Sequence, residues 1–179
     1  KIQNPIEWER IRRPEILEHF ASQMYGRIPG TLPSPEVRTL EEATLAIEDK
    51  AIRKQIQLAF KNGADSICMN ILIYTPNKKL KAPVFLGYNF AGNYLLHKDP
   101  FILIDGKKES ELTGDSYKKF NVKKRGERTS RWAIEKIIES GYGLVTLNYN
   151  DVDRDKNDFS DGIHSLLYKS DQIKPEDDQ

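Results

Sequence analysis

The chain is poor in cysteine, and neither sign of charge dominates it. A lone cysteine, Cys68, excludes an internal disulfide and, within "SICMNILIY", is expected to be a small buried side chain. Lysine and arginine total 28 against 27 acidic residues, for a net charge of +1. Charge therefore gives no reason to expect nucleic acid or an anionic membrane as a partner.

Long apolar runs and cofactor motifs are also missing from the sequence. No apolar stretch approaches the roughly 18 residues of a membrane span, and "KIQNPIEWER" does not have the pattern of a signal peptide. The sequence lacks clustered His and Cys ligands and glycine loops that cradle phosphate, so we expect no metal and no cofactor. The acidic run "NDVDRDKND" fails as a calcium loop, because Lys156 stands where glycine is needed and Gly162 where glutamate is needed.

Hydrophobic periodicity predicts a single α/β domain over residues 1–179, with a helix at its amino terminus. In "RRPEILEHFASQMYGRIPG", apolar residues recur at helical spacing, which predicts an amphipathic helix over 14–25 that ends before Gly26. Its apolar face is formed by Ile16, Leu17, Phe20, Ala21 and Met24.

Alternating and continuous apolar runs predict strands within residues 41–90. "EEATLAIED", "AIRKQIQLAF" and "SICMNILIYTP" favour an antiparallel meander, with a turn at "KNGAD". "APVFLGYNF" is typical of a buried central strand.

A parallel unit is expected to follow the meander. "SRWAIEKIIESGYG" predicts a helix over 130–140, with Thr129 or Ser130 as its amino-terminal cap and Gly141 as its terminator. It leads into a strand over 143–149, which implies a parallel strand–helix–strand unit. The polar tail 169–179 has no further strand, so the sheet would end on an apolar edge and the fold is expected to be incomplete.

The loop "NFAGN", residues 89–93, is the candidate site. It follows a predicted strand of the parallel unit, and ligands of open α/β sheets bind outside the carboxyl ends of the strands. Backbone N–H groups there could face an oxyanion, with Gly92 allowing close approach. The alternative is a simple polar turn that closes the strand.

No nucleophile accompanies this loop. Ten serines are present, but none lies in a G-x-S-x-G elbow or a near relative of it. His164 is expected to be structural, on a short helix or turn, and His19 and His97 have no evident partner in the sequence. We therefore expect no catalytic residue within the chain.

Several motifs together resemble a known family. They are "RRPEILEHFASQMYGRIPG", "VFLGYNFAGN", "RGERTSRWAIEKIIESGYGLVTLNYNDVDRD" and "FSDGIHSLL". In this order they are similar to the amino-terminal half of carbohydrate esterase family 15, the glucuronoyl and acetyl-xylan-esterase-like enzymes.

The resemblance implies an α/β-hydrolase fold and a hydrolase that cleaves esters of plant cell-wall glucuronoxylan with a serine triad and without a cofactor. The family's nucleophile elbow, its arginine, acid and histidine would lie beyond Gln179, so this chain alone would be inactive. Asn89, Phe90, Ala91, Gly92 and Asn93 match the loop on the rim of the family's active site.

Two functional interpretations remain open at this point. The chain is either part of a xylan-degrading esterase, completed by a carboxy-terminal fragment, or a truncated non-catalytic module that binds carbohydrate or pairs with a second copy. In the second case Tyr88, Phe90 and Tyr94 would form a carbohydrate platform, although Phe90 is expected to be buried. The resemblance, and a first residue other than Met, favour a secreted, periplasmic or extracellular location.

Overall fold

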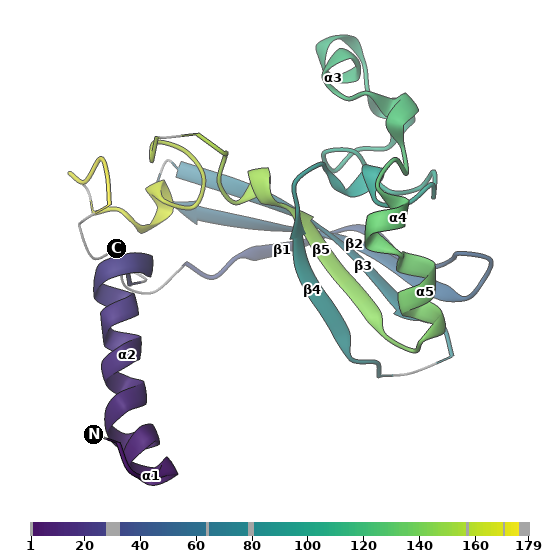
Figure 1. Cartoon of the computed structure of the whole chain (residues 1–179). Helices are drawn as coiled ribbons and strands as arrows, with labels where there is room; N and C mark the ends of the chain where they lie inside the picture. The colour runs from purple at the N-terminus through teal and green to yellow at the C-terminus, as the bar shows by residue number, and fades with distance from the viewer. Residues whose placement is uncertain are drawn as a thin grey trace.

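The computed structural model of the chain describes residues 2–27, 33–63, 65–78, 81–156, 158–169 and 171–175. One mixed five-stranded sheet carries short helices and long loops, and a helix projects from it at the amino terminus (Figure 1). No described helix is both long and apolar enough to cross a membrane.

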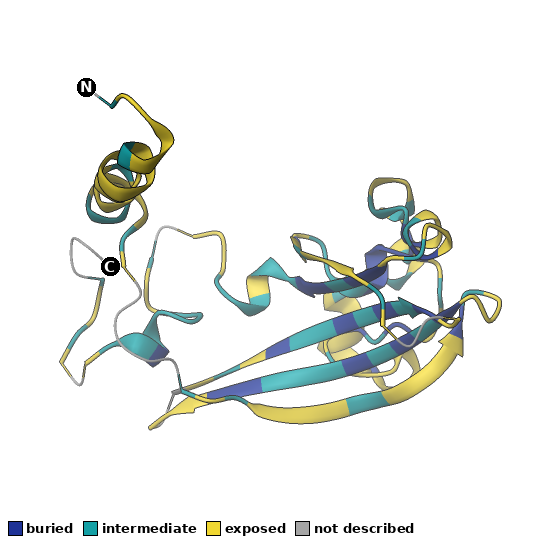
Figure 2. Ribbon diagram, turned by 90° about the horizontal axis from the view of Figure 1, so that it is seen from below, coloured by how far each residue is buried: buried dark blue, intermediate teal, exposed yellow. Residues whose placement is uncertain are grey.

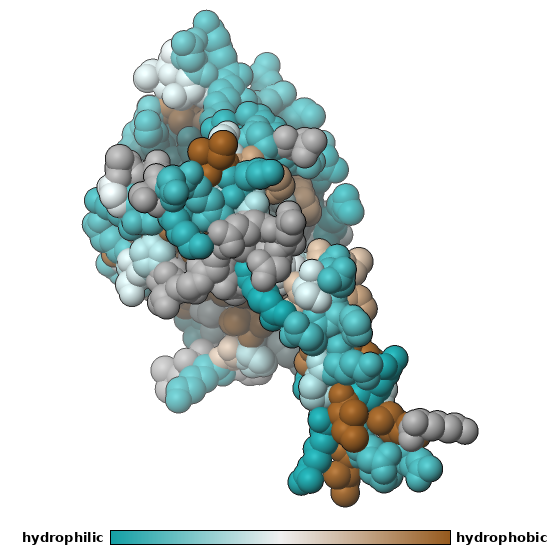
Figure 3. All heavy atoms as spheres, turned by 90° about the vertical axis from the view of Figure 1, so that its left-hand side faces the viewer, coloured by the Kyte–Doolittle hydropathy of each residue, from teal (hydrophilic) through white to brown (hydrophobic). Residues whose placement is uncertain are grey.

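The amino-terminal helix is longer than predicted and is exposed on all sides. It runs through the α-helical segments α1 (Pro5–Glu7) and α2 (Arg13–Phe20) and the π-helical segments η1 (Trp8–Arg12) and η2 (Ala21–Tyr25). It ends at Gly26, which has φ of 74°. Its apolar stripe faces solvent: Leu17 is 52% exposed and Met24 66%. Figure 2 shows this exposure, and Figure 3 shows apolar atoms at the helix surface.

The sheet confirms the predicted meander followed by a parallel pair. β1 (Glu36–Ala46), β2 (Ala51–Asn62) and β3 (Asp65–Pro76) pair antiparallel in sequence order. β5 (Gly143–Asn148) then pairs antiparallel with β3 and parallel with β4 (Val84–Asn89), which gives the order β1-β2-β3-β5-β4.

Alternation along the strands divides the core between the two faces of the sheet. On one face Leu72 and Tyr74 pack with Leu144 and with Ile134 and Ile138 of a covering helix. On the other face Met69 and Leu147 pack with Phe60 and Leu166, the last from the short helix η7 (Ser165–Leu167).

β4 is an exposed edge strand, so the prediction of a buried central strand was wrong for this chain. Val84, Leu86 and Tyr88 are 47%, 73% and 54% exposed. Phe85 between them is also exposed, at 55%, with its ring 5.4 Å from that of Tyr142, and Tyr88 meets the Tyr149 ring edge-on. Within the described residues, no strand pairs with the outer edge of β4. The apolar run was read correctly as a strand, but its neighbours could not be inferred from it.

The predicted helix over 130–140 is broken in two. α4 (Thr129–Trp132) ends and α5 (Ile134–Glu139) begins at Ala133, which has left-handed angles of 40° and 43°. Neither Thr129 nor Ser130 caps a helix; the Thr129 hydroxyl donates to the Gly126 carbonyl instead. Gly141 terminates α5 as expected, with φ of 83°.

The long connection after β4 is short of regular structure. It contains only the turns η3 (Asn93–Leu95), η4 (Glu109–Glu111) and η5 (Val122–Lys124) and the helix α3 (Gly114–Lys119). The strand predicted over 143–149 ends one residue early, in the turn η6 (Tyr149–Asp151). Residues 171–175 of the predicted tail contain no helix or strand, and 170 and 176–179 lie outside the described residues.

A buried charged cluster ties this connection to the sheet. Arg53 of β2 is 2% exposed; its guanidinium donates to both oxygens of Glu41 and, over 2.5 Å, to Asp99. The Tyr74 hydroxyl donates to the same Asp99 oxygen over 2.6 Å. Burial would raise the pKa of Asp99, but the Tyr74 hydroxyl, the Phe101 N–H and Arg53 together lower it. Asp99 is therefore an ionised anchor at neutral pH.

Two expectations about single side chains are corrected by the structure. His97 has partners: it is buried, accepts from the Asp99 N–H through Nδ1, and lies 3.1 Å from Glu135 through Nε2. Cys68 is exposed rather than buried. Both errors have the same origin, because local sequence does not show which face of a strand or loop is covered.

Replacing Ala133 with glycine should stabilise the fold. The left-handed conformation costs a residue with a Cβ about 1–2 kcal/mol, and glycine relieves that cost. We expect Ala133→Gly to raise the free energy of unfolding by about 1 kcal/mol in urea titration. Ala21→Gly, at a right-handed helical position with φ of −66°, is the matched control and should lower it. Destabilisation by both would contradict the assignment.

Removing the Asp99 carboxylate should destabilise the folded state strongly. Asp99→Ala removes one of the two carboxylates that bind the buried Arg53 and the acceptor of the Tyr74 hydroxyl, so we expect a loss of about 3–5 kcal/mol in unfolding free energy. Because the folded pKa is lowered, the contribution of Asp99 is full above the ordinary carboxyl value of 3.8 and is lost as pH falls through the folded value. Glu36→Ala, which breaks an exposed pair with Arg38, should change little.

Candidate functional site

The candidate site lies where the two parallel strands end. Asn89 is the register partner of Asn148, so the loops that follow β4 and β5 leave the sheet side by side. The first contains the "NFAGN" residues and the second contains Tyr149–Asp151. This is the edge of an open α/β sheet at which ligands bind.

The Asn89 side chain holds the first loop in place through three hydrogen bonds. Its side chain is 1% exposed, and its oxygen accepts from the Gly92 N–H over 2.8 Å. Its amide nitrogen donates to Asn93 over 2.8 Å and to the Thr146 hydroxyl of β5 over 3.2 Å. A buried amide with three partners fixes the loop to the adjacent strand, which a simple polar turn would not require.

Gly92 and Asn93 continue this arrangement. Gly92 has φ of 99°, and a Cβ there would lie 3.2 Å from the Tyr94 ring, so glycine is favoured by conformation and by space. Asn93 donates to the carbonyl of Asn70 in β3 over 2.9 Å. The loop is thereby attached to β3 as well as to β5.

Ala91 leaves a main-chain donor free. The Ala91 side chain packs against the larger core cluster. Within the described part of the chain, its N–H has no hydrogen-bond acceptor. A free N–H on a loop held at both sides is the kind of donor an oxyanion requires.

Aromatic side chains flank the loop on the open face of the sheet. Phe90 is 73% exposed, against the expectation of burial, and its ring lies 5.0 Å from that of Tyr149. Tyr88 meets the same Tyr149 ring edge-on at 6.1 Å. Tyr94 is 7% exposed and packs in the core, so the predicted platform of Tyr88, Phe90 and Tyr94 does not exist; Tyr149 takes the place of Tyr94.

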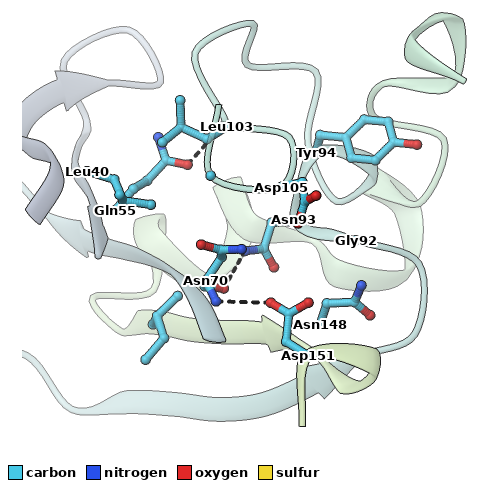
Figure 4. A pocket seen from close by; sticks show the side chains of 12 residues that line it. Leu40, Gln55, Asn70, Gly92, Asn93, Tyr94, Leu103, Asp105, Asn148 and Asp151 are labelled. Atoms are coloured by element: carbon cyan, nitrogen blue, oxygen red, sulfur yellow. Dashed lines mark hydrogen bonds between the residues drawn. The ribbon is translucent and has the colours of Figure 1, made fainter. Parts of the chain in front are cut away.

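A small polar cavity of about 40 Å³ opens beside the loop (Figure 4). Asn70, Asn93, Asn148 and Asp151 line it, and the Asn70 N–H donates to Asp151 over 3.0 Å. Burial and then the nearby Asp105 charge raise the pKa of Asp151, against the opposing effect of the Asn70 N–H. Perturbed carboxylates in hollows are typical of functional sites, though ion-pair networks produce them too.

Among the residues that the structure describes, the other titratable candidates from the sequence form no second site. His164 directly precedes η7 and lies 3.5 Å from Asp153, with the Phe159 ring against it, in keeping with a structural role. Among the described residues, no three His, Cys, Asp or Glu side chains are grouped to hold a metal ion.

The sequence singled out the first loop as a candidate but not the side chains that surround it. Asn70, Asn148 and Asp151 come from two further segments. Only Asn148, at the end of the second predicted parallel strand, and Asp151, just after it, carried a usable signal. Asn70 lies in the middle of a strand of the meander, where a polar side chain ordinarily belongs to the solvated face of the sheet.

Known proteins share the sequence and the fold of this chain. The chain is 37% identical over 182 residues to the carbohydrate esterase MZ0003 of an unknown prokaryotic organism, covering all of this chain and 42% of that protein. It superposes on a glucuronoyl esterase from Solibacter usitatus with a TM-score of 0.75 and 31% identity, over 97% of this chain and 44% of that one.

A promiscuous CE15 esterase from a marine bacterial metagenome gives a TM-score of 0.70 at 36% identity, over 98% of this chain and 44% of that chain. No protein-family model matches the sequence. By sequence and by fold, the chain matches the amino-terminal part of carbohydrate esterase family 15 proteins. It spans less than half the length of these relatives and corresponds to the amino-terminal part of the family fold.

The titration of Asp151 predicts how stability depends on pH at the site. With a raised folded pKa, this group favours the folded state below the ordinary value of 3.8 and opposes it as pH rises through the folded value. Asp151→Asn keeps the acceptor for Asn70 and removes the charge. At pH 7 we expect this variant to have a higher midpoint urea concentration of unfolding than the parent. Near pH 3 the two midpoints should be equal. Equal stability at both pH values would contradict a buried charge in this cavity.

Proposed function

We propose that this chain supplies the oxyanion side of a serine carboxylic-ester hydrolase acting on glucuronoxylan esters of the plant cell wall. Its nucleophile, arginine, acid and base would come from polypeptide outside these 179 residues. The observation that carries the proposal is the loop of residues 89–93, fixed by Asn89 at the carboxyl ends of two parallel strands.

The loop has the properties that acyl transfer needs. A tetrahedral intermediate places negative charge on the former carbonyl oxygen, and rigid N–H donors stabilise that charge without reorganising. The Ala91 N–H is one donor that this chain can offer, and Asn89 and Asn93 hold the loop on either side of it. A second donor next to the serine would complete the hole.

The open edge of β4 supports a site shared with further polypeptide. Val84, Leu86 and Tyr88 leave an apolar surface on the strand that leads directly into the loop. β4 pairs with β5 on one side only, and an edge strand with exposed apolar side chains is suited to receive another strand on its free side. The relatives are more than twice as long as the matched region. A strand added there would end beside the loop, where a nucleophile elbow is required.

In the proposed mechanism the serine attacks the ester carbonyl, the alcohol leaves with a proton from the histidine, and water then releases the glucuronate. No cofactor is involved. Because a cell-wall polymer cannot enter a cell, the proposal includes a periplasmic or extracellular location, which fractionation of the producing organism would test.

Asn89 is the residue whose loss tests the loop. In the protein that carries this chain together with its nucleophile, Asn89→Ala should lower kcat for a benzyl glucuronate ester by about 10²–10³, because the loop and its donor lose their fixed position. KM should change much less, since the ground-state ester makes little use of the oxyanion donor.

The control is Asn150→Ala, which removes an exposed amide from the second loop and should leave both constants unchanged. Circular dichroism must show that the Asn89 variant is folded. A folded Asn89 variant with normal kcat would overturn the oxyanion role. If the parent protein shows no esterase activity and the chain instead pairs through β4 as a dimer, the non-catalytic interpretation replaces this one.

A further inference from the structure

A second hollow lies at the other end of the sheet from β4. It is an open groove of about 900 Å³ between the edge strand β1 and the connection that follows the site loop. Leu45 of β1, Phe101 and Leu103 of the connection and Tyr117 of α3 give it mostly apolar walls. This volume is within the range of ligand-binding clefts.

We propose that this groove binds uncharged sugar rings of the xylan main chain, as an accessory site remote from the ester bond. The inference rests on the proposed function for the polymer, but on different residues for the contact. Sugar rings present apolar faces of C–H groups and an equator of hydroxyls, so they pack on exposed aromatic rings with polar groups around them.

Phe101 is an exposed ring on a fixed backbone. Its side chain is 67% exposed, yet its N–H donates to Asp99 and its carbonyl accepts from Gln55 over 2.9 Å. The Arg53 guanidinium lies 5.3 Å from the ring centroid. An apolar ring held in this way loses little freedom on binding, which favours a ligand site over a mere surface defect.

The charges around the groove are largely neutralised before any ligand arrives. Glu41 binds Arg53 at the floor, and Glu109 at the rim lies 3.0 Å from Arg125. The rim also offers the hydroxyls of Thr44 and Ser110 and the ammonium of Lys108, which has no ion pair among the described residues. These groups can hydrogen-bond the hydroxyls of a saccharide whose ring packs on the aromatic side chains.

The groove also adjoins the small polar cavity of the candidate site. Leu40 and Leu103 line both the groove and the small polar cavity, and Gly92 and Asn93 line that cavity on its far side. A polymer bound along this surface would therefore pass from the groove toward the loop. Because β1 and β4 are opposite edges of the sheet, polypeptide that pairs with β4 would leave the groove open.

The test is a titration of the ¹⁵N-labelled chain with xylohexaose, followed by amide shifts. We expect shifts confined to residues 44–45, 101–103 and 108–117, and dissociation constants about tenfold higher for Phe101→Ala and for Tyr117→Ala. Phe159→Ala removes another exposed ring, outside the groove, and should bind like the parent.

Unshifted groove amides at millimolar xylohexaose, or equal affinity of the Phe101 and Tyr117 variants and the parent, would overturn the inference. So would stronger binding of benzyl alcohol than of the sugar at the same amides. Esterase activity without groove binding would remove the accessory site alone, whereas groove binding without esterase activity would remove the proposed function alone.

Discussion

The buried guanidinium of Arg53 is the interaction on which much of this chain depends. It stands on β2 and binds carboxylates from β1 and from the connection after β4, so one side chain joins three segments far apart in sequence. Gln55 lies two residues further along β2 and holds the same connection, because it accepts from the Leu103 N–H and donates to the Phe101 carbonyl. Without this cluster, neither the groove nor the far side of the small cavity would have a fixed wall.

A second set of hydrogen bonds joins the end of this connection to its start. The Gly126 N–H donates to the Tyr94 carbonyl and the Arg128 N–H to that of Leu95. Gly126 has φ of 75°, and a Cβ there would lie 2.9 Å from the Lys98 backbone nitrogen, so the approach of the two segments requires glycine. The site loop is thus the start of a connection held along its length, which explains how a stretch with so little regular structure can carry a defined geometry.

The strands, the parallel unit and the candidate loop could be predicted because each has a local pattern in the sequence. Alternation defined β2, the apolar run defined β4, and "NFAGN" combined glycine and amides at a strand end. Burial was less predictable, because it depends on what covers a face: Phe90 and Cys68 were expected inside and lie outside, while His97 was expected free and lies inside with partners.

The break at Ala133 shows the same limit at the level of a helix. Every residue from 130 to 140 is compatible with one helix, and nothing local requires left-handed angles at an alanine. The turn lets α5 place Ile134 and Ile138 in the core while Trp132 lies over Gly87 of β4. The break at Ala133 is therefore determined by tertiary packing, which cannot be inferred from the local sequence.

The central claim is that the loop of residues 89–93 is one side of an ester-hydrolysing site whose nucleophile lies elsewhere. The most direct measurement is hydrolysis of a benzyl glucuronate ester by the purified 179-residue chain, compared with the protein that carries both this chain and a serine elbow. The account predicts no turnover above background for the chain alone, and turnover abolished by a serine-directed inhibitor for the longer protein. Hydrolysis by the chain alone, at the rate of the longer protein, would contradict it.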